Sequence, residues 1–258
     1  TPRSLIKRLG KMLLYPIALR SFNAALYVGK HSRRYWTYYK YPKKRLFFSP
    51  HCVDNQWFAQ RATEEAGVSL RRKHGIGDSD RVVLFAGKLV PFKRPLDLIA
   101  AVALLANRLP NLTVLIAGSG PLSKDVSDMA TQKGVKLVQL GFCNQSEMPV
   151  AYAAADALVL PSQGETWGLV ANEALACRLP IVVSDACGCA ADLAADAVAG
   201  RVYSMGDVEA LADAIADLLA NIPDPQTIFC KASDYSLEEA VKGIVQALAA
   251  VSSEGSLA

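Results

Sequence analysis

The sequence lacks three features that would place it in common protein classes. It has no run of about 20 apolar residues, the length a membrane-spanning helix needs; the run at 12–19 is flanked by Lys11 and Arg20 and contains Pro16. Its six cysteines lack C-x-x-C spacing, which argues against structural zinc and favours reduced thiols. No G-x-G-x-x-G turn follows the first predicted strand of the main domain, which disfavours an NAD-type dehydrogenase.

Acidic residues are also missing from the first 53 positions, which carry twelve Lys or Arg side chains. The rest of the chain has 16 basic and 24 acidic residues, so the net charge of +4 conceals a strongly basic start. Two interpretations fit this segment equally: a helix on an anionic membrane surface, or a solvated helix that belongs against a neighbouring domain. Its apolar residues are spaced for one helical face: Leu5, Leu9, Met12 and Leu13.

The overall composition is that of a folded protein, with 52% hydrophobic and 20% charged residues. Disordered, collagen-like and coiled-coil classes are thereby excluded. The length of 258 residues lies between one and two domains of about 150 residues each. Because the first residue is Thr1 rather than methionine, we expect a fragment or a processed product.

Short β-branched segments alternate with helical patterns from position 81 onward. The segments are almost continuously apolar, as is typical of strands covered on both faces: 82–87, 112–118, 135–141, 157–161, 180–185 and 200–204. Helices are predicted between them, at 95–109, 122–133, 145–155, 168–178 and 207–221. The repeated strand–helix–strand order predicts an α/β fold with a doubly wound parallel sheet, one Rossmann-like domain.

Smaller predicted parts flank this domain. A strand–helix–strand unit at 25–29, 31–40 and 46–50 either completes the downstream sheet or ends a preceding domain. A last helix at 236–251 precedes a polar tail that we expect to be disordered. The predicted division is a basic remnant and linker at 1–50, the Rossmann-like domain at 51–235, and a helix with its tail at 236–258.

Ligands in such folds bind beyond the carboxyl ends of the strands, so residues that follow strands are the candidates. The fourth strand of the main domain leads to Gly168, which opens a helix. The amides of Gly168, Leu169 and Val170 are unpaired at that helix start, where the dipole is positive, and they predict a phosphate site. Asp78 and Asp80 precede a strand, so this pair is predicted to form a turn rather than a metal–nucleotide site.

Glu173 lies on an otherwise apolar face of that helix. Its neighbours three and four positions away are Leu169, Val170, Ala176 and Cys177. A carboxylate in such surroundings is costly to bury unless hydrogen bonds satisfy it. The hydroxyl pair of a ribose would do so, and capping of a neighbouring loop's backbone is the alternative. Glu165, in the loop before the helix, either points into the same cleft or is a solvated loop acid.

The loop after the first strand of the domain carries three cations, Lys88, Lys93 and Arg94. The expected strand order places this loop opposite the helix that begins at Gly168. Cations in that position would complement a pyrophosphate whose other side meets the helix amides.

These residues resemble the family 4 retaining glycosyltransferases, whose GT-B fold has two Rossmann-like domains facing across a cleft. The strongest mark is the E-x7-E element from Glu165 to Glu173, with the aromatic–glycine pair Trp167-Gly168. Other matching segments are GKLVPFKRP at 87–95, GSGP at 118–121, LGF at 140–142 and PSQGETWGLVANEALACRLPIVVSD at 161–185. The resemblance extends from about Ala25 to Ala220.

The resemblance implies that this chain supplies the donor-binding half of a retaining glycosyl transfer, from a nucleoside-diphosphate sugar to an acceptor hydroxyl. By resemblance, Glu173 holds the ribose hydroxyls, and Lys88 and Lys93 hold the diphosphate. The same comparison gives the helix amides a phosphate role and places the base against the backbone near the LGF segment. The residues concerned are Gly168, Leu169, Val170 and Phe142.

The implied catalytic residues are Glu165, near the anomeric carbon of the donor sugar, and Lys93. No metal and no cofactor is expected, because two lysines and a helix end can stabilise the leaving diphosphate. Lys88 departs from the family's usual arginine, so we expect a looser or differently angled phosphate grip. Since two such domains need about 350–400 residues, the isolated chain is expected to bind its donor weakly and to transfer poorly or not at all.

Two other readings stay open: a GT-B enzyme of other chemistry, such as an epimerase or a phosphorylase, and a non-catalytic nucleotide-sugar-binding module. The expected partners are a nucleoside-diphosphate sugar and a saccharide or lipid-linked acceptor, with no nucleic acid. Peripheral membrane contact through residues 1–45 would place the chain in the cytoplasm at the inner face of a membrane. Such a location suits polysaccharide or glycolipid biosynthesis.

Overall fold

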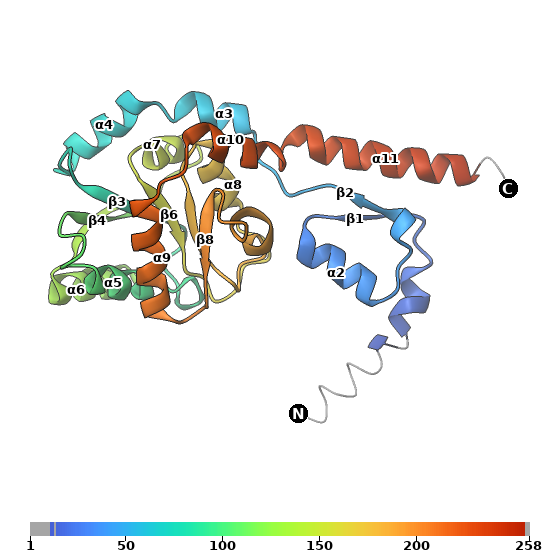
Figure 1. Cartoon of the computed structure of the whole chain (residues 1–258), viewed down its shortest axis with the longest axis horizontal. Coiled ribbons are helices and arrows are strands. Elements are labelled where there is room, and N and C mark those ends of the chain that lie inside the picture. Colours follow the sequence, from blue (N-terminus) through green and yellow to red (C-terminus); the bar gives the residue numbers. More distant parts are fainter. Residues whose placement is uncertain (1–10, 13, 256–258) are drawn as a thin grey trace. The chain divides into compact units, whose positions relative to one another are not determined.

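The computed structural model describes residues 11–12 and 14–255. The chain divides into a larger compact unit, Val53–Asp234, and a smaller one built from the segments on either side of it. Figure 1 shows the helices and strands of both units, coloured along the sequence. Leu5, Leu9 and Leu13, which the sequence assigns to a basic amphipathic helix, lie outside the described residues.

Six parallel strands form the sheet of the larger unit, in the order β5-β4-β3-β6-β7-β8. Their bounds are β3 (Arg81–Ala86), β4 (Leu112–Ala117), β5 (Lys136–Gly141), β6 (Ala157–Leu160), β7 (Ile181–Ser184) and β8 (Gly200–Tyr203). The chain runs outward from β3 in one direction and resumes at β6 in the other. The predicted doubly wound α/β fold is confirmed, and its switch point lies between β3 and β6.

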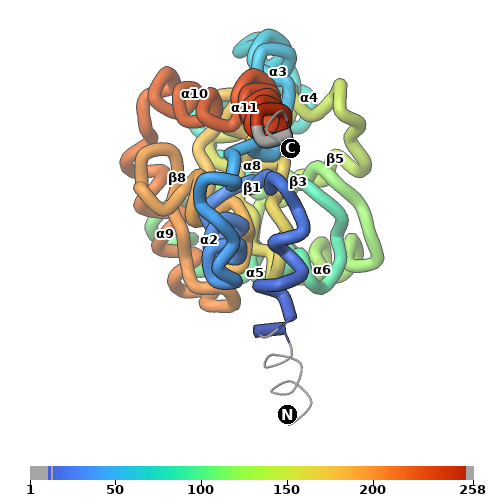
Figure 2. The backbone as a smooth tube through the Cα atoms, turned by 90° about the vertical axis from the view of Figure 1, so that its right-hand side faces the viewer, coloured from blue at the N-terminus to red at the C-terminus, as the bar shows by residue number. Residues whose placement is uncertain are grey.

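Helices cover both faces of this sheet. One face carries α5 (Pro95–Leu104), α6 (Ser123–Lys133) and α9 (Val208–Ala220). The other carries α3 (Asn55–Arg61), α4 (Glu64–Lys73), α7 (Met148–Ala153), α8 (Leu169–Ala176) and α10 (Pro225–Ser233). Figure 2 shows β5 and β8 at opposite edges, with α5, α6 and α9 on one side of the sheet and α3, α4 and α10 on the other.

Burial explains why the strands are so apolar. All six residues of β4 are buried, as are five of the six in β3, because helices lie on both faces. The helix α9 contributes Leu211, Ile215 and Leu218 to the same core, and it starts at Asp207, whose carboxylate accepts a hydrogen bond from the amide of Ala210. The core thus fixes the sheet whose carboxyl edge carries the candidate residues.

Three helices, α3, α4 and α10, lie outside the set predicted from periodicity. Each begins at a side chain that accepts a hydrogen bond from an amide of the first turn: Asp54, Thr63 and Asp224. A short π-helical turn at Ala190–Ala194 also follows β7. The three helices pack against α7 and α8 despite a weak helical period, so their capping residues were the available signal.

The smaller unit contains a separate two-stranded parallel sheet of β1 (Ala25–Tyr27) and β2 (Leu46–Phe48). The alternative that these strands complete the downstream sheet is therefore wrong. They are accompanied by α2 (Lys30–Tyr38), a 3-10 turn (Lys43–Arg45) and α11 (Leu237–Gly255). α11 continues four residues past the predicted end of the last helix, so 252–255 are helical rather than part of a disordered tail. No described helix has both the length and the hydropathy to cross a bilayer.

Candidate functional site

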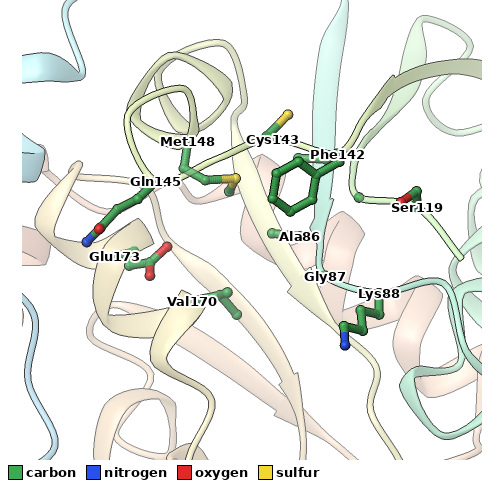
Figure 3. Close-up of a pocket in the computed structure, with 12 residues that line it drawn as sticks. Ala86, Gly87, Lys88, Ser119, Phe142, Cys143, Gln145, Met148, Val170 and Glu173 are labelled. Atoms are coloured by element: carbon green, nitrogen blue, oxygen red, sulfur yellow. The ribbon is translucent and has the colours of Figure 1, made fainter.

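A cavity of about 460 Å³ lies at the carboxyl ends of β3, β4 and β5 and against α8. This is the edge at which doubly wound folds bind ligands. Figure 3 shows Lys88 and Glu173 on opposite sides of the cavity, with Val170 between them and Phe142 across from Val170. Gln145 lies beside Glu173 on the same side. The cavity thus brings together residues that follow three strands and residues of the helix α8.

The loops after β3 and β4 touch each other along one wall of the cavity. A Cβ atom added to Gly118 would lie 1.9 Å from the carbonyl oxygen of Gly87, so only glycine permits this approach. The backbone also bonds across, from the amide of Leu89 to the carbonyl of Ser119 at 3.0 Å. The glycine of the GSGP segment therefore allows the two loops to pack side by side. This packing role fits a segment that lacks the third glycine of a dinucleotide-binding turn.

Glu173 is half-buried and accepts a hydrogen bond at Oε2 from the hydroxyl of Tyr152, at 2.6 Å. Burial raises the pKa of Glu173 above its ordinary value, and the Tyr152 hydrogen bond offsets part of this effect. The pKa of Tyr152 is raised well above its usual range by burial first and by Glu173 second. The sequence pattern predicts ribose hydroxyls or a loop backbone as partners of Glu173 and does not indicate Tyr152. The carboxylate lines the cavity and accepts a hydrogen bond from this tyrosine side chain rather than from a loop backbone.

The helix α8 begins at Gly168, whose φ of 105° belongs to the left-handed region that favours glycine. A buried hydrogen bond holds this turn, since the indole Nε1 of Trp167 donates to Oδ1 of Asn172 at 2.7 Å. The amides of Gly168, Leu169 and Val170 form none of the described hydrogen bonds, as expected for a first helical turn. Val170 lines the cavity, which places the positive end of the helix dipole beside it.

The two lysines that follow β3 have different surroundings. Lys88 lines the cavity, on the side opposite Glu173 (Figure 3). Lys93 forms an ion pair with Glu165, which follows β6. The loops that carry them are bonded directly, from the amide of Gln163 to the carbonyl of Phe92 at 2.7 Å. Of these two lysines, Lys88 therefore lines the cavity, whereas Lys93 pairs with the carboxylate of Glu165.

Arg94, the third cation in this loop, is held away from that pair. Its guanidinium Nε donates to Oδ2 of Asp97 at 2.6 Å, one turn along α5. Arg94 thus pairs with a residue of α5, and Lys88 and Lys93 are the two cations of the loop that remain candidates for binding phosphate.

Four of the residues predicted for the site line the cavity: Lys88, Phe142, Val170 and Glu173. The others lie in adjoining loops and at the start of α8: Lys93, Glu165, Gly168 and Leu169. Residues that sequence reasoning did not single out complete the lining, among them Ser119, Cys143, Gln145 and Met148. Gln145 lies in the turn before α7 and Met148 is the first residue of α7, so neither directly follows a strand.

Asp78 and Asp80 sit at the opposite edge of the sheet, as predicted. The carboxylate of Asp80 accepts from the amide of Gly77 and pairs with Lys136, which confirms a turn. No cluster of three or more metal-ligating side chains occurs among the described residues. All six cysteines are free thiols, and burial raises the pKa of Cys187, beside the Glu165 loop, to about 11.

The comparison with known families agrees with this geometry. Residues 69–251 match the family described as glycosyl transferases group 1. The chain belongs to this family. Within the group 1 glycosyl transferases, a GDP-mannose-dependent alpha-(1-6)-phosphatidylinositol monomannoside mannosyltransferase of Mycolicibacterium smegmatis is 31% identical over 204 residues, covering 76% of this chain and 52% of the relative. A D-inositol 3-phosphate glycosyltransferase of Corynebacterium glutamicum is 39% identical over 168 residues, covering 62% and 39%.

Solved structures share the fold. Anabaena HepE in complex with UDP has a TM-score of 0.74 at 21% identity, covering 88% of this chain and 64% of that one. A glycosyltransferase from Rickettsia africae has a TM-score of 0.73 at 17% identity, covering 92% and 65%. The GT-B resemblance is thus confirmed at the level of the fold and the family. The chain spans about half or less of the length of the curated relatives described above.

Proposed function

We propose that this chain supplies the donor-binding half of a family 4 retaining glycosyltransferase, which transfers a sugar from a nucleoside diphosphate to an acceptor hydroxyl. The observation that carries the proposal is the cavity at the switch of the sheet. A lysine, a carboxylate on an apolar helix face and the start of α8 converge there. The names of the relatives support this ligand class, since one is called GDP-mannose-dependent and HepE was solved with UDP-glucose.

The cavity suits a nucleoside diphosphate in size and in polarity. Its volume of about 460 Å³ lies in the range of small-molecule sites. We place the ribose hydroxyls against Glu173, which has one carboxylate oxygen bonded to Tyr152 and can accept further hydrogen bonds. The base lies toward Phe142 and Met148, which offer an apolar rim. The diphosphate then points toward Lys88.

The chemical demand of the transfer is charge stabilisation as the diphosphate leaves. Lys88, Lys93 and the amides at the start of α8 would stabilise the negative charge that develops on it. Glu165 would hold the sugar, whose anomeric carbon becomes oxocarbenium-like, and retention follows from attack on the face that the leaving group departs. These groups supply the positive charge without a metal or a cofactor, so chelation by EDTA is expected to leave nucleotide binding unchanged.

Isothermal titration calorimetry with UDP, GDP and ADP tests the ribose assignment. We expect Glu173→Ala to weaken whichever nucleotide the wild type prefers by about tenfold, since a charged hydrogen-bond partner is lost. The control is Glu65→Ala, which removes an exposed carboxylate from α4, outside the cavity lining. Equal affinities of Glu173→Ala and the wild type for all three nucleotides would contradict the ribose role.

For the acceptor we propose a saccharide or a lipid-linked sugar, with peripheral membrane contact through the basic start of the chain. In the described part of that segment, exposed Leu14 and Ile17 lie between exposed Lys11 and Arg20. Such a mixture of apolar and cationic side chains suits an anionic lipid surface. Co-sedimentation with anionic and neutral vesicles should show binding to the anionic ones, lost when residues 1–24 are removed. Equal pelleting of both chains would end the membrane proposal.

A further inference from the structure

The carboxylate of Glu165 is held from one side only. Both of its described partners reach the same oxygen, Oε1: the ammonium of Lys93, and the hydroxyl of Ser162, which donates at 3.1 Å. No described residue hydrogen-bonds Oε2. The side chain of Glu165 is 14% exposed, so its orientation depends on these partners rather than on solvent.

Ser162 is itself fixed by buried polar contacts. It is fully buried, and its carbonyl oxygen accepts a hydrogen bond of 2.6 Å from the hydroxyl of Ser184, which is also fully buried. The hydroxyl of Ser184 lies 3.4 Å from the thiol of Cys187. The loop after β7 also bonds the backbone of Glu165, whose carbonyl accepts from the amide of Gly188 at 2.9 Å. The end of β6 and the end of β7 therefore form one rigid support.

We propose that Ser162 is a positioning residue for Glu165, and that it presents Oε2 to a hydroxyl of the donor sugar. This inference rests on the proposed function. Lys93 is drawn toward the diphosphate of a bound donor, because two phosphates compete with Glu165 for its ammonium. Because Ser162 is neutral and buried, its hydroxyl continues to donate a hydrogen bond to Oε1 of Glu165 when the diphosphate also interacts with Lys93. A pre-oriented acceptor oxygen loses less entropy when the sugar binds.

A positioning role and a purely structural role for Ser162 lead to different donor affinities. Removal of its hydroxyl should weaken only the part of donor affinity that the sugar contributes. The affinity for the bare nucleoside diphosphate should stay the same, because Lys88, Glu173 and the α8 amides do not contact Ser162 in the described hydrogen bonds. The measured quantity is therefore the ratio of the affinity for a nucleotide sugar to that for its diphosphate.

The test is calorimetric titration of the whole chain with UDP, UDP-glucose, GDP and GDP-mannose. The variants are Ser162→Ala and Ser162→Cys, which keeps the shape of the side chain with a slightly larger atom and replaces the hydroxyl by a weaker hydrogen-bond donor. The matched control is Thr113→Ala, which removes an equally buried hydroxyl from β4, where that hydroxyl has no hydrogen-bond partner among the described residues. Circular dichroism and thermal unfolding of each variant establish that it is folded.

We expect both Ser162 variants to lose about five- to tenfold of the affinity that the sugar adds, with the diphosphate affinity within twofold of the wild type. Thr113→Ala should keep the sugar contribution even where it lowers the melting temperature. An unchanged sugar contribution in Ser162→Ala and Ser162→Cys overturns the inference, and so does an equal loss in Thr113→Ala. A wild type that binds none of the four nucleotides contradicts the proposed function instead.

Discussion

The half-buried carboxylate of Glu173 illustrates how one residue can favour ligand binding at a cost in stability. Burial raises its pKa, so the folded protein holds the proton more tightly than the unfolded chain does. The stability that this proton confers is fully present below the unfolded pKa and is lost as the pH rises through the folded pKa. At neutral pH the protein therefore carries the cost of an ionised, partly desolvated group.

Glu173→Gln is expected to raise stability at pH 7, because a neutral amide avoids that cost and its oxygen can still accept from Tyr152. The gain should shrink as the pH falls through the folded pKa of Glu173, where the wild type also becomes neutral. Urea unfolding of both proteins between pH 4 and pH 8 measures this difference.

The same protonation is expected to weaken nucleotide binding in acid, since a protonated carboxyl accepts hydrogen bonds poorly.

The control for the unfolding experiment is Glu65→Gln, at an exposed position of α4, which should leave the pH dependence of stability as it is in the wild type. A Glu173→Gln variant that is less stable than the wild type at every pH would show that the carboxylate contributes more through its bonds than burial costs.

At the scale of elements, the cavity wall depends on how closely two loops approach. Gly118→Ala is expected to destabilise the protein by roughly 2–4 kcal/mol, since its Cβ would overlap the Gly87 carbonyl and its φ of 153° is strained for alanine. Nucleotide affinity should fall as well, because the loop with Lys88 must shift. Thermal or urea unfolding together with calorimetry measures both effects.

Gly134→Ala separates the overlap from the backbone strain. Gly134 also has a positive φ, 68°, but no atom lies within 4 Å of its added Cβ, at the end of α6. Its replacement should cost only about 1 kcal/mol and should leave nucleotide binding unchanged. If Gly118→Ala costs no more than Gly134→Ala, the two loops are less tightly packed than the structure shows.

Periodicity alone predicted the sheet, because strands covered on both faces must be apolar throughout. It also placed Lys88 and Glu173 at one edge, since parallel strands end together. The partners of the two glutamates could not be predicted in this way. Tyr152 lies 21 positions before Glu173, and only the packing of α7 beside α8 brings the hydroxyl to the carboxylate. Ser162 is three residues from Glu165, yet nothing in the pattern shows that the loop folds back on itself.

The distribution of charge over the whole chain raises a question about the origin of nucleotide affinity. The larger unit, 53–234, carries 15 Lys or Arg against 21 Asp or Glu and is therefore acidic, while the two flanking segments together carry 13 Lys or Arg against 3 Asp or Glu, twelve of the 13 before position 53. A nucleoside diphosphate is an anion, so its binding to an acidic unit has to come from local groups in the cavity. Those groups act over a few ångströms, whereas the net charge acts over a Debye length of about 10 Å at 0.1 M salt.

Residues 53–234 alone are therefore expected to fold and to bind UDP or GDP with the same affinity as the full chain at 0.5 M salt, because they contain the whole sheet, its core and every cavity residue. At 10 mM salt the shorter chain should bind several-fold more weakly and associate more slowly, since the unscreened charge of its acidic surface repels the ligand. Stopped-flow and calorimetric titrations at both salt concentrations measure this. A difference in affinity that persists at 0.5 M salt would mean that the flanking segments take part in the site itself, and not only in the field around it.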